Sequence, residues 1–244
     1  MLKYLRSFFV ILSFGIFAVG AIFYNFILFP PLKLFFKGQR LAEVYSDIIH
    51  YSWKFFTNII MFFGLFRLDI KNIEDIKNIK NKVIVATHPS FIDIVILIGL
   101  IPRSTCFVKK ELAYNPILKN LVNSIFITNE LELEELKIQS KKMLDMGFNL
   151  IIFPSGIRHR RDEFPKIKKG ASLVALNAQK NIVPIKFFAD GDFLFINKPF
   201  YDADDHLITF EIEKCEEIDV ENLNAETEII AKQKITKSIE KSLY

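Results

Sequence analysis

The chain has 244 residues, 51% of them hydrophobic, with a mean hydropathy of +0.25. This length suits one domain with an appendage, and a fully soluble protein of this size is seldom so apolar, so we expect contact with a membrane. The net charge of +4 is uneven: residues 202–228 hold eleven acids and one base, or −10, which leaves +14 elsewhere. A basic body favours an anionic membrane surface or a phosphorylated substrate. No nucleic-acid motif accompanies it, so no nucleic-acid partner is expected.

Residues 8–29 form an uncharged run of 22 residues, which is long enough to cross a bilayer core as a helix. The run is too long for a signal-peptide core and predicts an uncleaved anchor, which ends where Pro30-Pro31 break the helix. The apolar stretch Leu41–Phe66 carries several charges, as is typical of an interfacial helix or one arm of a re-entrant hairpin. Residues 1–66 are therefore predicted to be a membrane anchor and amphipathic helix. Basic residues on both sides of the first run leave open whether it spans the bilayer or dips into it.

Short β-rich runs alternate with helical stretches from Val83 onward. The predicted strands are Val83–Thr87, Thr105–Lys109, Ser124–Thr128, Leu150–Phe153, Ile182–Phe188, Phe193–Asn197 and Leu207–Ile212. The predicted helices are Ser90–Leu100, 130–146 with Asn129 and Glu132 as a capping box, Ala171–Gln179 and 225–243. This alternation is typical of an α/β fold with a mixed, partly parallel sheet flanked by helices, here preceded by the N-terminal membrane-associated helical segment.

A histidine and a carboxylate five positions apart, His88 and Asp93, directly follow the first of these strands. An imidazole titrates near neutrality, and a carboxylate on its second nitrogen fixes the tautomer and stabilises the imidazolium. Such a pair can take a proton from a hydroxyl group while that hydroxyl attacks an acyl carbonyl. The spacing alone leaves a second interpretation open, in which His88 is a buried histidine and Asp93 a surface or capping acid.

The remaining polar residue types exclude other chemistry. The two cysteines, Cys106 and Cys215, lie far apart, which indicates no disulfide framework and fits a reducing cytoplasm. The four histidines are scattered without metal-ligand spacing, so no metal site is predicted. A serine hydrolase is disfavoured because Ser155 lacks the first glycine of a Gly-x-Ser-x-Gly turn.

Four segments occur in order and carry a family resemblance. They are His88–Asp93; Phe107–Leu112, continuing to Ser124–Ile127; Ile151–Arg158; and Ile182–Ile185, preceded by Lys169–Ala171. Together they resemble the glycerolipid acyltransferase family that includes the 1-acylglycerol-3-phosphate (lysophosphatidate) acyltransferases, over residues 80–190. The resemblance implies that residues 67–244 form an acyltransferase domain. Its activity would move a fatty acyl chain from acyl carrier protein or coenzyme A to the hydroxyl of a membrane lipid, with no cofactor beyond this co-substrate.

The resemblance also implies a location and roles for single residues. The enzyme would lie on the inner (cytoplasmic) membrane, with its domain on the anionic cytoplasmic face. His88 would be the general base and Asp93 would orient it, without an acyl-enzyme intermediate. The implied substrate-binding residues are Lys109, Lys110, Phe153, Pro154, Ser155, Gly156, Arg158 and Pro184. The arginine suits a phosphate because its planar guanidinium binds an oxyanion in two places. As structural alternatives, Gly156 would be a turn glycine and Pro184 an edge-strand proline.

Three positions depart from the family pattern. Ser155 stands where the family usually has glutamate, Ile157 where it has threonine, and Asn129 where an arginine helps to hold phosphate. Nearby bases either compensate or form a solvated basic face; they are His159, Arg160, Arg161, Lys166, Lys168 and Lys169. The acceptor is therefore lysophosphatidate or a phosphate-free lipid, as in ornithine-lipid or aryl-polyene acyltransferases. A catalytically silent lipid-binding homologue is the alternative from another class.

Overall fold

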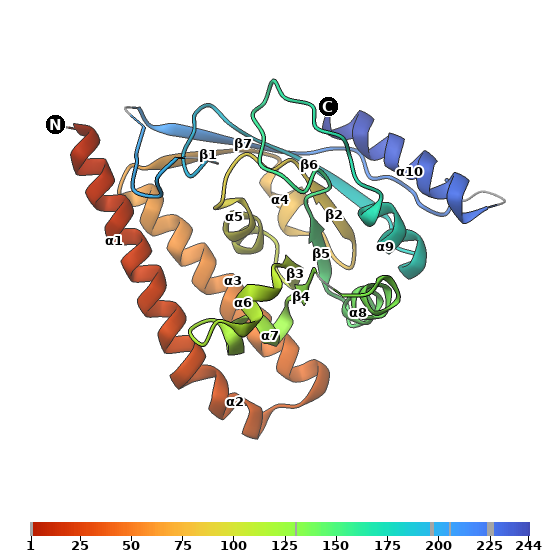
Figure 1. Cartoon of the computed structure of the whole chain (residues 1–244), viewed down its shortest axis with the longest axis horizontal. Helices are drawn as coiled ribbons and strands as arrows, with labels where there is room; N and C mark the ends of the chain where they lie inside the picture. The colour runs from red at the N-terminus through yellow and green to blue at the C-terminus, as the bar shows by residue number, and fades with distance from the viewer. Residues whose placement is uncertain (1, 130, 196–197, 205, 224–226) are drawn as a thin grey trace.

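The computed structural model describes residues 2–129, 131–195, 198–204, 206–223 and 227–244. Within this part of the chain, seven strands form one sheet in the order β1-β7-β6-β2-β5-β3-β4 (Figure 1). All neighbouring strands are parallel except β6 and β7, which are antiparallel. The strands are β1 (Phe66–Lys71), β2 (Val83–Ala86), β3 (Ser104–Val108), β4 (Ile127–Thr128), β5 (Asn149–Ile152), β6 (Ile182–Ala189) and β7 (Ile208–Lys214). The predicted α/β fold with a mixed, mostly parallel sheet is confirmed.

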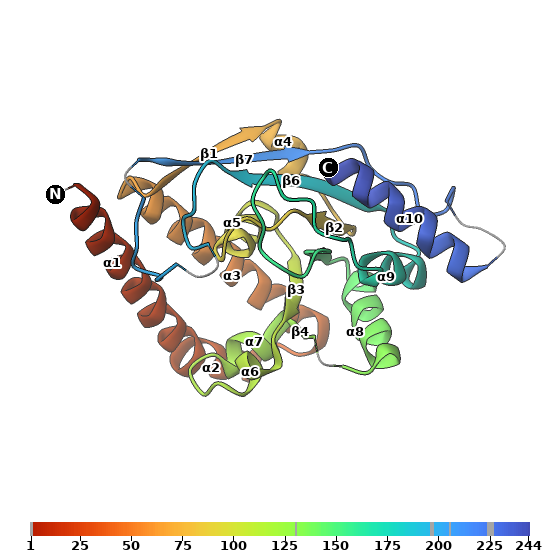
Figure 2. The ribbon, with the colours of Figure 1, turned by 45° about the horizontal axis from the view of Figure 1, so that its top comes forward.

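Helices cover both faces of the sheet because successive strand residues point to opposite sides. Ile84 and Ala86 of β2 pack into one core with α1 (Leu2–Phe23), α3 (Gly38–Phe62) and α5 (Asp93–Leu100). Val83 and Val85 pack into a second core with α8 (Leu133–Asp145), α9 (Gly170–Ala178) and α10 (Glu228–Leu243). Figure 2 shows these two helical layers on either side of the strands. The short helices are α4 (Ile73–Lys77), α6 (Lys110–Tyr114) and α7 (Lys119–Ile125).

The N-terminal helix does not break at Pro30-Pro31, and that prediction is wrong. α1 continues through a π-helical turn, η1 (Tyr24–Leu28), into α2 (Phe29–Phe35), and the prolines lie in the first turn of α2. A proline lacks an N–H group and its ring clashes with the carbonyl one turn back. The wider π turn before the prolines rearranges the carbonyls that would meet them. The helix ends instead at Phe36, whose backbone is extended.

α3 runs back along α1, and it packs against both α1 and the layer formed by α5 and the sheet. The rings of Phe17 in α1 and Phe56 in α3 lie 4.9 Å apart. α3 approaches α5 so closely that a β-carbon on Gly99 would lie 2.9 Å from the backbone nitrogen of Lys54. One core therefore continues across the boundary at residue 66, where β1 begins. The division into an anchor and a domain at this residue stays a prediction.

One predicted strand is wrong, a second is right only in its last two residues, and one strand was not predicted. Ser124 and Ile125 belong to α7, and only Ile127–Thr128 pair with β3. Phe193–Phe195 form a turn rather than a strand; residues 196–197 of that prediction lie outside the described residues. β1 pairs with β7 and starts where the predicted amphipathic arm was expected to end.

Three helix starts also differ from the prediction. α5 begins at Asp93 and not at Ser90. α8 begins after Glu132, which forms no side-chain cap, so the capping box at Asn129 is wrong. The backbone N–H of Asn129 instead donates to the carbonyl of Val108, the last residue of β3. α10 begins after Thr227, whose hydroxyl accepts from the N–H of Ile230; the predicted helical residues 225–226 lie outside the described residues.

Candidate active site

Two of the predicted site residues follow neighbouring central strands. β2 and β5 are parallel and in register, with Val83 opposite Leu150. Parallel strands end at the same edge of a sheet, so His88 after β2 and Phe153 after β5 emerge side by side. Thr87 extends the pairing of β2 with β6, because its hydroxyl donates to the carbonyl of Phe187 over 2.6 Å. The position of His88 is thus fixed by the centre of the sheet.

His88 and Asp93 form a hydrogen-bonded pair. Asp93 is the first residue of α5 and its side chain is fully buried, while that of His88 is 21% exposed. His88 Nδ1 lies 2.8 Å from Asp93 Oδ2, which also accepts from the backbone N–H of Ser90 over 2.8 Å. A carboxylate can only accept hydrogen bonds, so the proton lies on Nδ1 and Nε2 carries the free lone pair. Nε2 has no hydrogen bond to any of the described residues, so it is available to a substrate hydroxyl.

Burial and the neighbouring groups shift the pKa of the Asp93 carboxyl group in opposite directions. Burial raises the pKa of the Asp93 carboxyl group, because a low-dielectric environment disfavours its charged form. The hydrogen bond and charge of His88, the N–H of Ser90 and the charge of Arg158 act in the opposite direction. Asp93 Oδ1 is buried without a hydrogen-bond partner among the described residues. His88 is therefore the principal partner of this carboxylate.

Phe153 connects the histidine to the third sequence block. Its ring stacks on the imidazole of His88, with centroids 4.1 Å apart and planes inclined by 15°. The chain then turns sharply, since Gly156 donates its N–H to the carbonyl of Phe153 and has a φ of +70°. Ser155 is buried in this turn, and its hydroxyl donates to the carbonyl of Ile157 over 2.8 Å. The hydroxyl of Ser155 is thus engaged within the turn.

A turn that was predicted as a strand holds Arg158. Arg158 Nη1 donates to the carbonyl of Leu194 over 2.9 Å, and this carbonyl also accepts from the N–H of Phe91. Ser90 Oγ donates to the neighbouring carbonyl of Phe193 over 2.7 Å. Leu194 has a φ of +55°, a left-handed conformation that few side chains adopt. The apolar residues of this turn resemble a strand in sequence, and only Gly191-Asp192 before it indicates a turn.

The basic residues after Arg158 are largely occupied. His159 is buried and donates its backbone N–H to the carbonyl of His88 over 2.9 Å, and its Nε2 lies 3.3 Å from the hydroxyl of Tyr244. Burial lowers the pKa of the His159 imidazole and raises the pKa of Tyr244 to about 12. Arg160 forms two hydrogen bonds with Asp192, and Arg161 pairs with Glu211. His159 thus supports the backbone of His88.

The other predicted binding residues lie on or after two other strands, β3 and β6. Lys109 and Lys110 follow β3, which is parallel to β5, so they lie at the same edge as His88. Pro184 lies opposite Val85 inside the sheet and is buried. The alternative of an edge-strand proline is wrong, because β6 lies between β7 and β2. Pro184 is tolerated there because it lies just beyond the last register pair of β6 with β7, Ile185 opposite Lys214. Its carbonyl accepts from the N–H of Cys215, and a proline has no N–H to donate in return.

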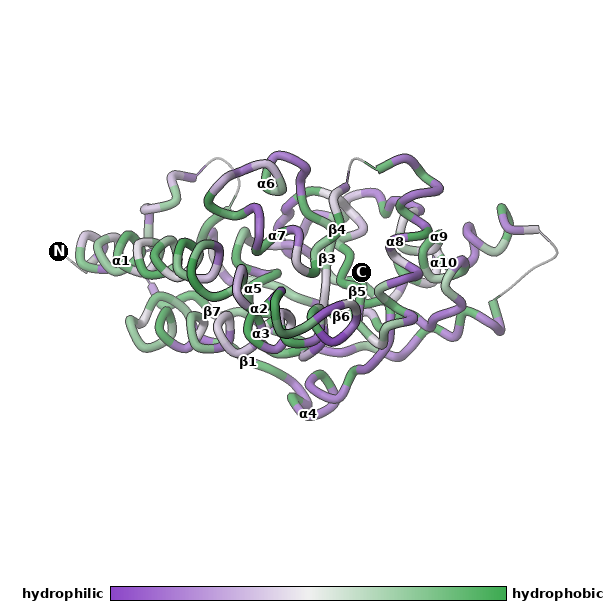
Figure 3. Tube along the Cα trace, turned by 90° about the horizontal axis from the view of Figure 1, so that it is seen from below, coloured by the Kyte–Doolittle hydropathy of each residue, from purple (hydrophilic) through white to green (hydrophobic). Residues whose placement is uncertain are grey.

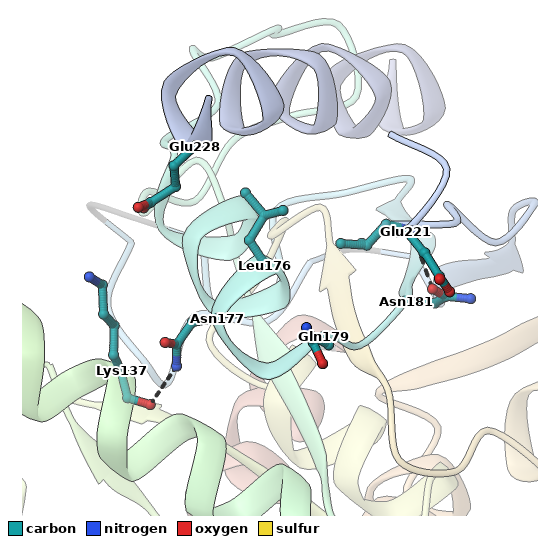
Figure 4. Close-up of a pocket in the computed structure, with 8 residues that line it drawn as sticks. Lys137, Leu176, Asn177, Gln179, Asn181, Glu221 and Glu228 are labelled. Carbon is teal, nitrogen blue, oxygen red and sulfur yellow. Dashed lines mark hydrogen bonds between the residues drawn. The ribbon is translucent and has the colours of Figure 1, made fainter. Parts of the chain in front are cut away.

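A polar hollow that does not include His88 lies between α8, α9 and α10 (Figure 4). Asn177 donates to the backbone carbonyl of Lys137 at one end of it, and Asn181 accepts from the N–H of Val220 at the other. Lys137 is paired with Glu134. The hollow contains none of the predicted site residues.

Comparisons with known proteins identify the relatives of the chain. The family model "Acyltransferase" matches residues 67–187. The chain is 27% identical to human 1-acyl-sn-glycerol-3-phosphate acyltransferase beta over 67% of its own length and 60% of that protein. It is 32% identical to 1-acyl-sn-glycerol-3-phosphate acyltransferase of Helicobacter pylori over 53% of its length and 58% of that protein. The matches thus span less than two thirds of these relatives.

A solved structure shares the fold over the whole chain. The crystal structure of the 1-acyl-sn-glycerophosphate (LPA) acyltransferase PlsC from Thermotoga maritima superposes with a TM-score of 0.70. The superposition covers 99% of this chain and 98% of that chain, at 18% sequence identity. The likeness therefore includes the N-terminal helices as well as the sheet.

Proposed function

Because the chain belongs to the glycerolipid acyltransferase family that includes the 1-acylglycerol-3-phosphate acyltransferases, we propose that it acylates the free hydroxyl of a lysophospholipid, with lysophosphatidate as acceptor and phosphatidate as product. The observation that carries the proposal is the contact of 2.8 Å between His88 Nδ1 and a buried Asp93. This pair has the geometry that general-base activation of a hydroxyl requires. A catalytically silent homologue would have no need to keep this arrangement.

In the proposed reaction, His88 Nε2 takes the proton of the acceptor hydroxyl as its oxygen attacks the thioester carbonyl. An oxygen–carbon bond forms, the carbon–sulfur bond breaks, and the proton passes from the imidazolium to the leaving thiolate. Asp93 stabilises the imidazolium that forms between these two steps. The donor is an acyl thioester of acyl carrier protein or coenzyme A, and the reaction requires no further cofactor.

Arg158 is the residue proposed to hold the acceptor phosphate. It lies close enough to the histidine pair for its charge to act on Asp93, and one of its nitrogens is held by Leu194. A second candidate acceptor, a phosphate-free lyso-lipid, is favoured by the departures at Ser155 and Asn129. The Ser155 hydroxyl is engaged inside its own turn, so it does not replace the glutamate of the family pattern.

The N-terminal helix is proposed to hold the enzyme at the inner membrane, with the active site on the cytoplasmic side. The continuous helix Lys3–Phe35 is long and apolar enough to cross a bilayer, and only 17% of its apolar window is buried. The trace of α1 is largely coloured as hydrophobic in Figure 3, and Figure 1 shows this helix on the outside of the molecule. Such a surface in water would be strongly unfavourable, whereas lipid would cover it.

Two arrangements in the membrane are possible, a hairpin that dips into one leaflet and a segment that crosses the bilayer. Contacts at both ends of this helix favour the hairpin. Arg6 is buried and donates to the carbonyls of Gly64 and Leu65 after the end of α3. Asn25 donates to the carbonyl of Pro116 over 2.9 Å, and it accepts from the N–H of Asn120 over 2.7 Å. A helix docked on its own domain at both ends stays beside that domain.

The test is transfer by purified full-length protein in mixed detergent–lipid micelles. Lysophosphatidate and a phosphate-free monoacylglycerol are offered separately, each with acyl-coenzyme A and with acyl carrier protein thioester. Mass spectrometry of the lipids and thiol release are measured together. We expect phosphatidate, with thiol released in equal amount. Thiol release with diacylglycerol as the favoured product would transfer the assignment to the phosphate-free class, and no lipid product with either acceptor would refute acyl transfer to these lipids.

A further inference from the structure

Two backbone carbonyls between β6 and β7 hold two separate parts of the site. The carbonyl of Phe193 accepts the hydrogen bond of the buried Ser90 hydroxyl over 2.7 Å. The backbone N–H of Ser90 in turn donates to the carboxylate of Asp93 over 2.8 Å. The next carbonyl, that of Leu194, accepts from Arg158 over 2.9 Å. The histidine–aspartate loop and the third sequence block are therefore both attached to one turn.

The shape of this turn depends on what surrounds it. Leu194 has a φ of +55°, a left-handed conformation that a leucine keeps only where neighbouring contacts impose it. The side chains of Phe193 and Leu194 are both buried, so the turn is also fixed by packing. The residue before them, Asp192, makes the polar contacts that hold the turn against the rest of the domain.

Asp192 is bound through both its side chain and its backbone. Its carboxylate accepts two hydrogen bonds from Arg160, over 3.1 and 2.8 Å, and its side chain is 24% exposed. These hydrogen bonds hold the pKa of Asp192 below its ordinary value, so the carboxylate is charged at neutral pH. Its carbonyl accepts from the N–H of Phe195 over 3.0 Å. Because a two-pronged arginine–carboxylate contact fixes relative orientation, it sets where the turn begins with respect to the third block.

The N-terminal helix reaches the same turn from the other side. The carboxylate of Asp204 accepts from the backbone N–H of Asp192 over 3.1 Å and from Lys198 over 3.1 Å. The carbonyl of Asp204 accepts from the buried Arg6 of α1, also over 3.1 Å. Figures 1 and 2 both show this part of the chain beside α1. Two hydrogen bonds, Arg6 to Asp204 and Asp192 to Asp204, thus connect α1 to the turn.

We propose that Asp192 is a positioning residue of the active site, and that through it the docking of α1 controls the geometry of His88 and Arg158. The inference rests on the proposed function, because it concerns the regulation of that same site. Asp192 lies outside the four sequence segments that carry the family resemblance. The site is fully assembled only while α1 is seated on the domain, so this helix supports transfer as well as attachment.

A neighbouring ion pair provides a matched control. Arg161, the residue after Arg160, pairs with Glu211 of β7 over 3.0 Å. Exposed ion pairs typically add little to stability, and Asp192 could be one more of these. In that case Asp192→Asn and Glu211→Gln will have equal effects. If Asp192 positions the turn, only its replacement will impair transfer.

The kinetic test compares full-length Asp192→Asn, Asp192→Glu and Glu211→Gln with wild type in mixed detergent–lipid micelles. Misplacement of reacting groups by about 1 Å can cost about 100-fold in rate. We expect Asp192→Asn to lower kcat by at least about tenfold with whichever acceptor wild type uses, and to leave the KM of the acyl donor constant. Asp192→Glu should recover part of the loss, since it still accepts both hydrogen bonds, and Glu211→Gln should match wild type.

Hydrogen exchange followed by peptide mass spectrometry tests the coupling without turnover. The backbone N–H groups of Ser90 and Phe91 donate to Asp93 and Leu194, so their exchange reports how well the turn holds this loop. Asp192→Asn, Arg6→Gln and Arg6→Lys should each raise exchange in residues 88–93 by at least about tenfold, and Glu211→Gln should not. Unchanged protection of β5 serves as the control that the sheet of each variant is folded.

The outcomes separate this inference from the proposed function. Equal kcat in Asp192→Asn and Glu211→Gln, with wild type active, would refute the positioning role and leave the proposed function in place. Faster exchange in Asp192→Asn without a change in either Arg6 variant would refute the control by α1. If wild type acylates neither lipid, the proposed function fails, whereas the exchange measurement still decides whether α1 and the turn are coupled.

Discussion

The imidazole of His88 lies flat against the ring of Phe153, with their centroids 4.1 Å apart and their planes inclined by 15°. The two residues are far apart in sequence and meet because β2 and β5 are parallel neighbours. Asp93 holds Nδ1 from one edge of the imidazole, and Phe153 covers one of its faces. These two contacts restrain both the position and the tilt of the imidazole ring, so the direction of the Nε2 lone pair is also restrained.

Replacement of Phe153 should therefore impair catalysis without abolishing it. Aromatic pairs contribute about 0.5–1.5 kcal/mol beyond the area they bury, which corresponds to about 2- to 13-fold in rate. We expect Phe153→Ala to lower kcat within this range and Phe153→Tyr to stay near wild type. Steady-state kinetics with saturating acceptor would check this. Unchanged kcat in Phe153→Ala would show that the stack has no part in positioning the imidazole.

Replacement of Arg158 should impair use of a phosphorylated acceptor. Loss of its charge-assisted hydrogen bonds corresponds to about 10- to 150-fold, so Arg158→Ala should raise the KM for lysophosphatidate by this factor. Arg158→Lys should recover only part, since a point charge does not reproduce the planar fork. The KM for the acyl donor should stay constant. If Arg158→Ala leaves the preference for lysophosphatidate over monoacylglycerol unchanged, another residue binds the phosphate.

Removal of residues 1–66 should cause aggregation. The reason is that α3 buries Tyr45, Ile49 and Ile60 in the core that also holds α5. We expect a chain starting at Arg67 to sediment in detergent-free buffer. Full-length protein should stay in membranes that are washed with high salt, since salt screens charge but does not weaken apolar insertion. Extraction of full-length protein by salt alone would refute the anchor.

Acid should destabilise the folded chain partly through His159. Burial lowers the pKa of His159 in the folded state, whereas in the unfolded chain it titrates near its ordinary value of about 6.5. Below that value the unfolded chain takes up a proton that the folded chain does not, so stability falls as the pH falls. The melting temperature of wild type should drop more between about pH 7.5 and about pH 5.5 than that of His159→Gln. Equal drops would show that His159 makes no contribution.

The sequence predicted those parts of the fold in which local pattern and tertiary structure agree. Val83–Thr87 and Ile182–Phe188 are apolar, β-branched runs, and both are central strands. Ser124–Thr128 has the same composition, but its first two residues complete α7, where Leu121, Val122 and Ile125 are buried as a helical face. For a short apolar run, periodicity does not separate these outcomes.

The contact between His88 and Asp93 was predictable, because it depends on residue type and spacing. The stack of Phe153 on His88 and the carbonyls of Phe193 and Leu194 were not predictable, because they depend on strand register and on backbone atoms that every residue carries.

The central claim is that His88, oriented by Asp93, is the general base of acyl transfer. The most direct measurement is turnover of purified full-length His88→Ala with lysophosphatidate and acyl donor, with Asp93→Asn beside it. Loss of a general base typically lowers the rate by about 10²–10⁴, so His88→Ala should lose nearly all transfer. The His88→Ala protein should still fold and associate with membranes, and a fall in its melting temperature is expected because the buried carboxylate of Asp93 loses its principal partner. Asp93→Asn should also be severely impaired, since the imidazole loses its orienting charge. A His88→Ala protein that keeps at least half of the wild-type turnover would contradict the claim.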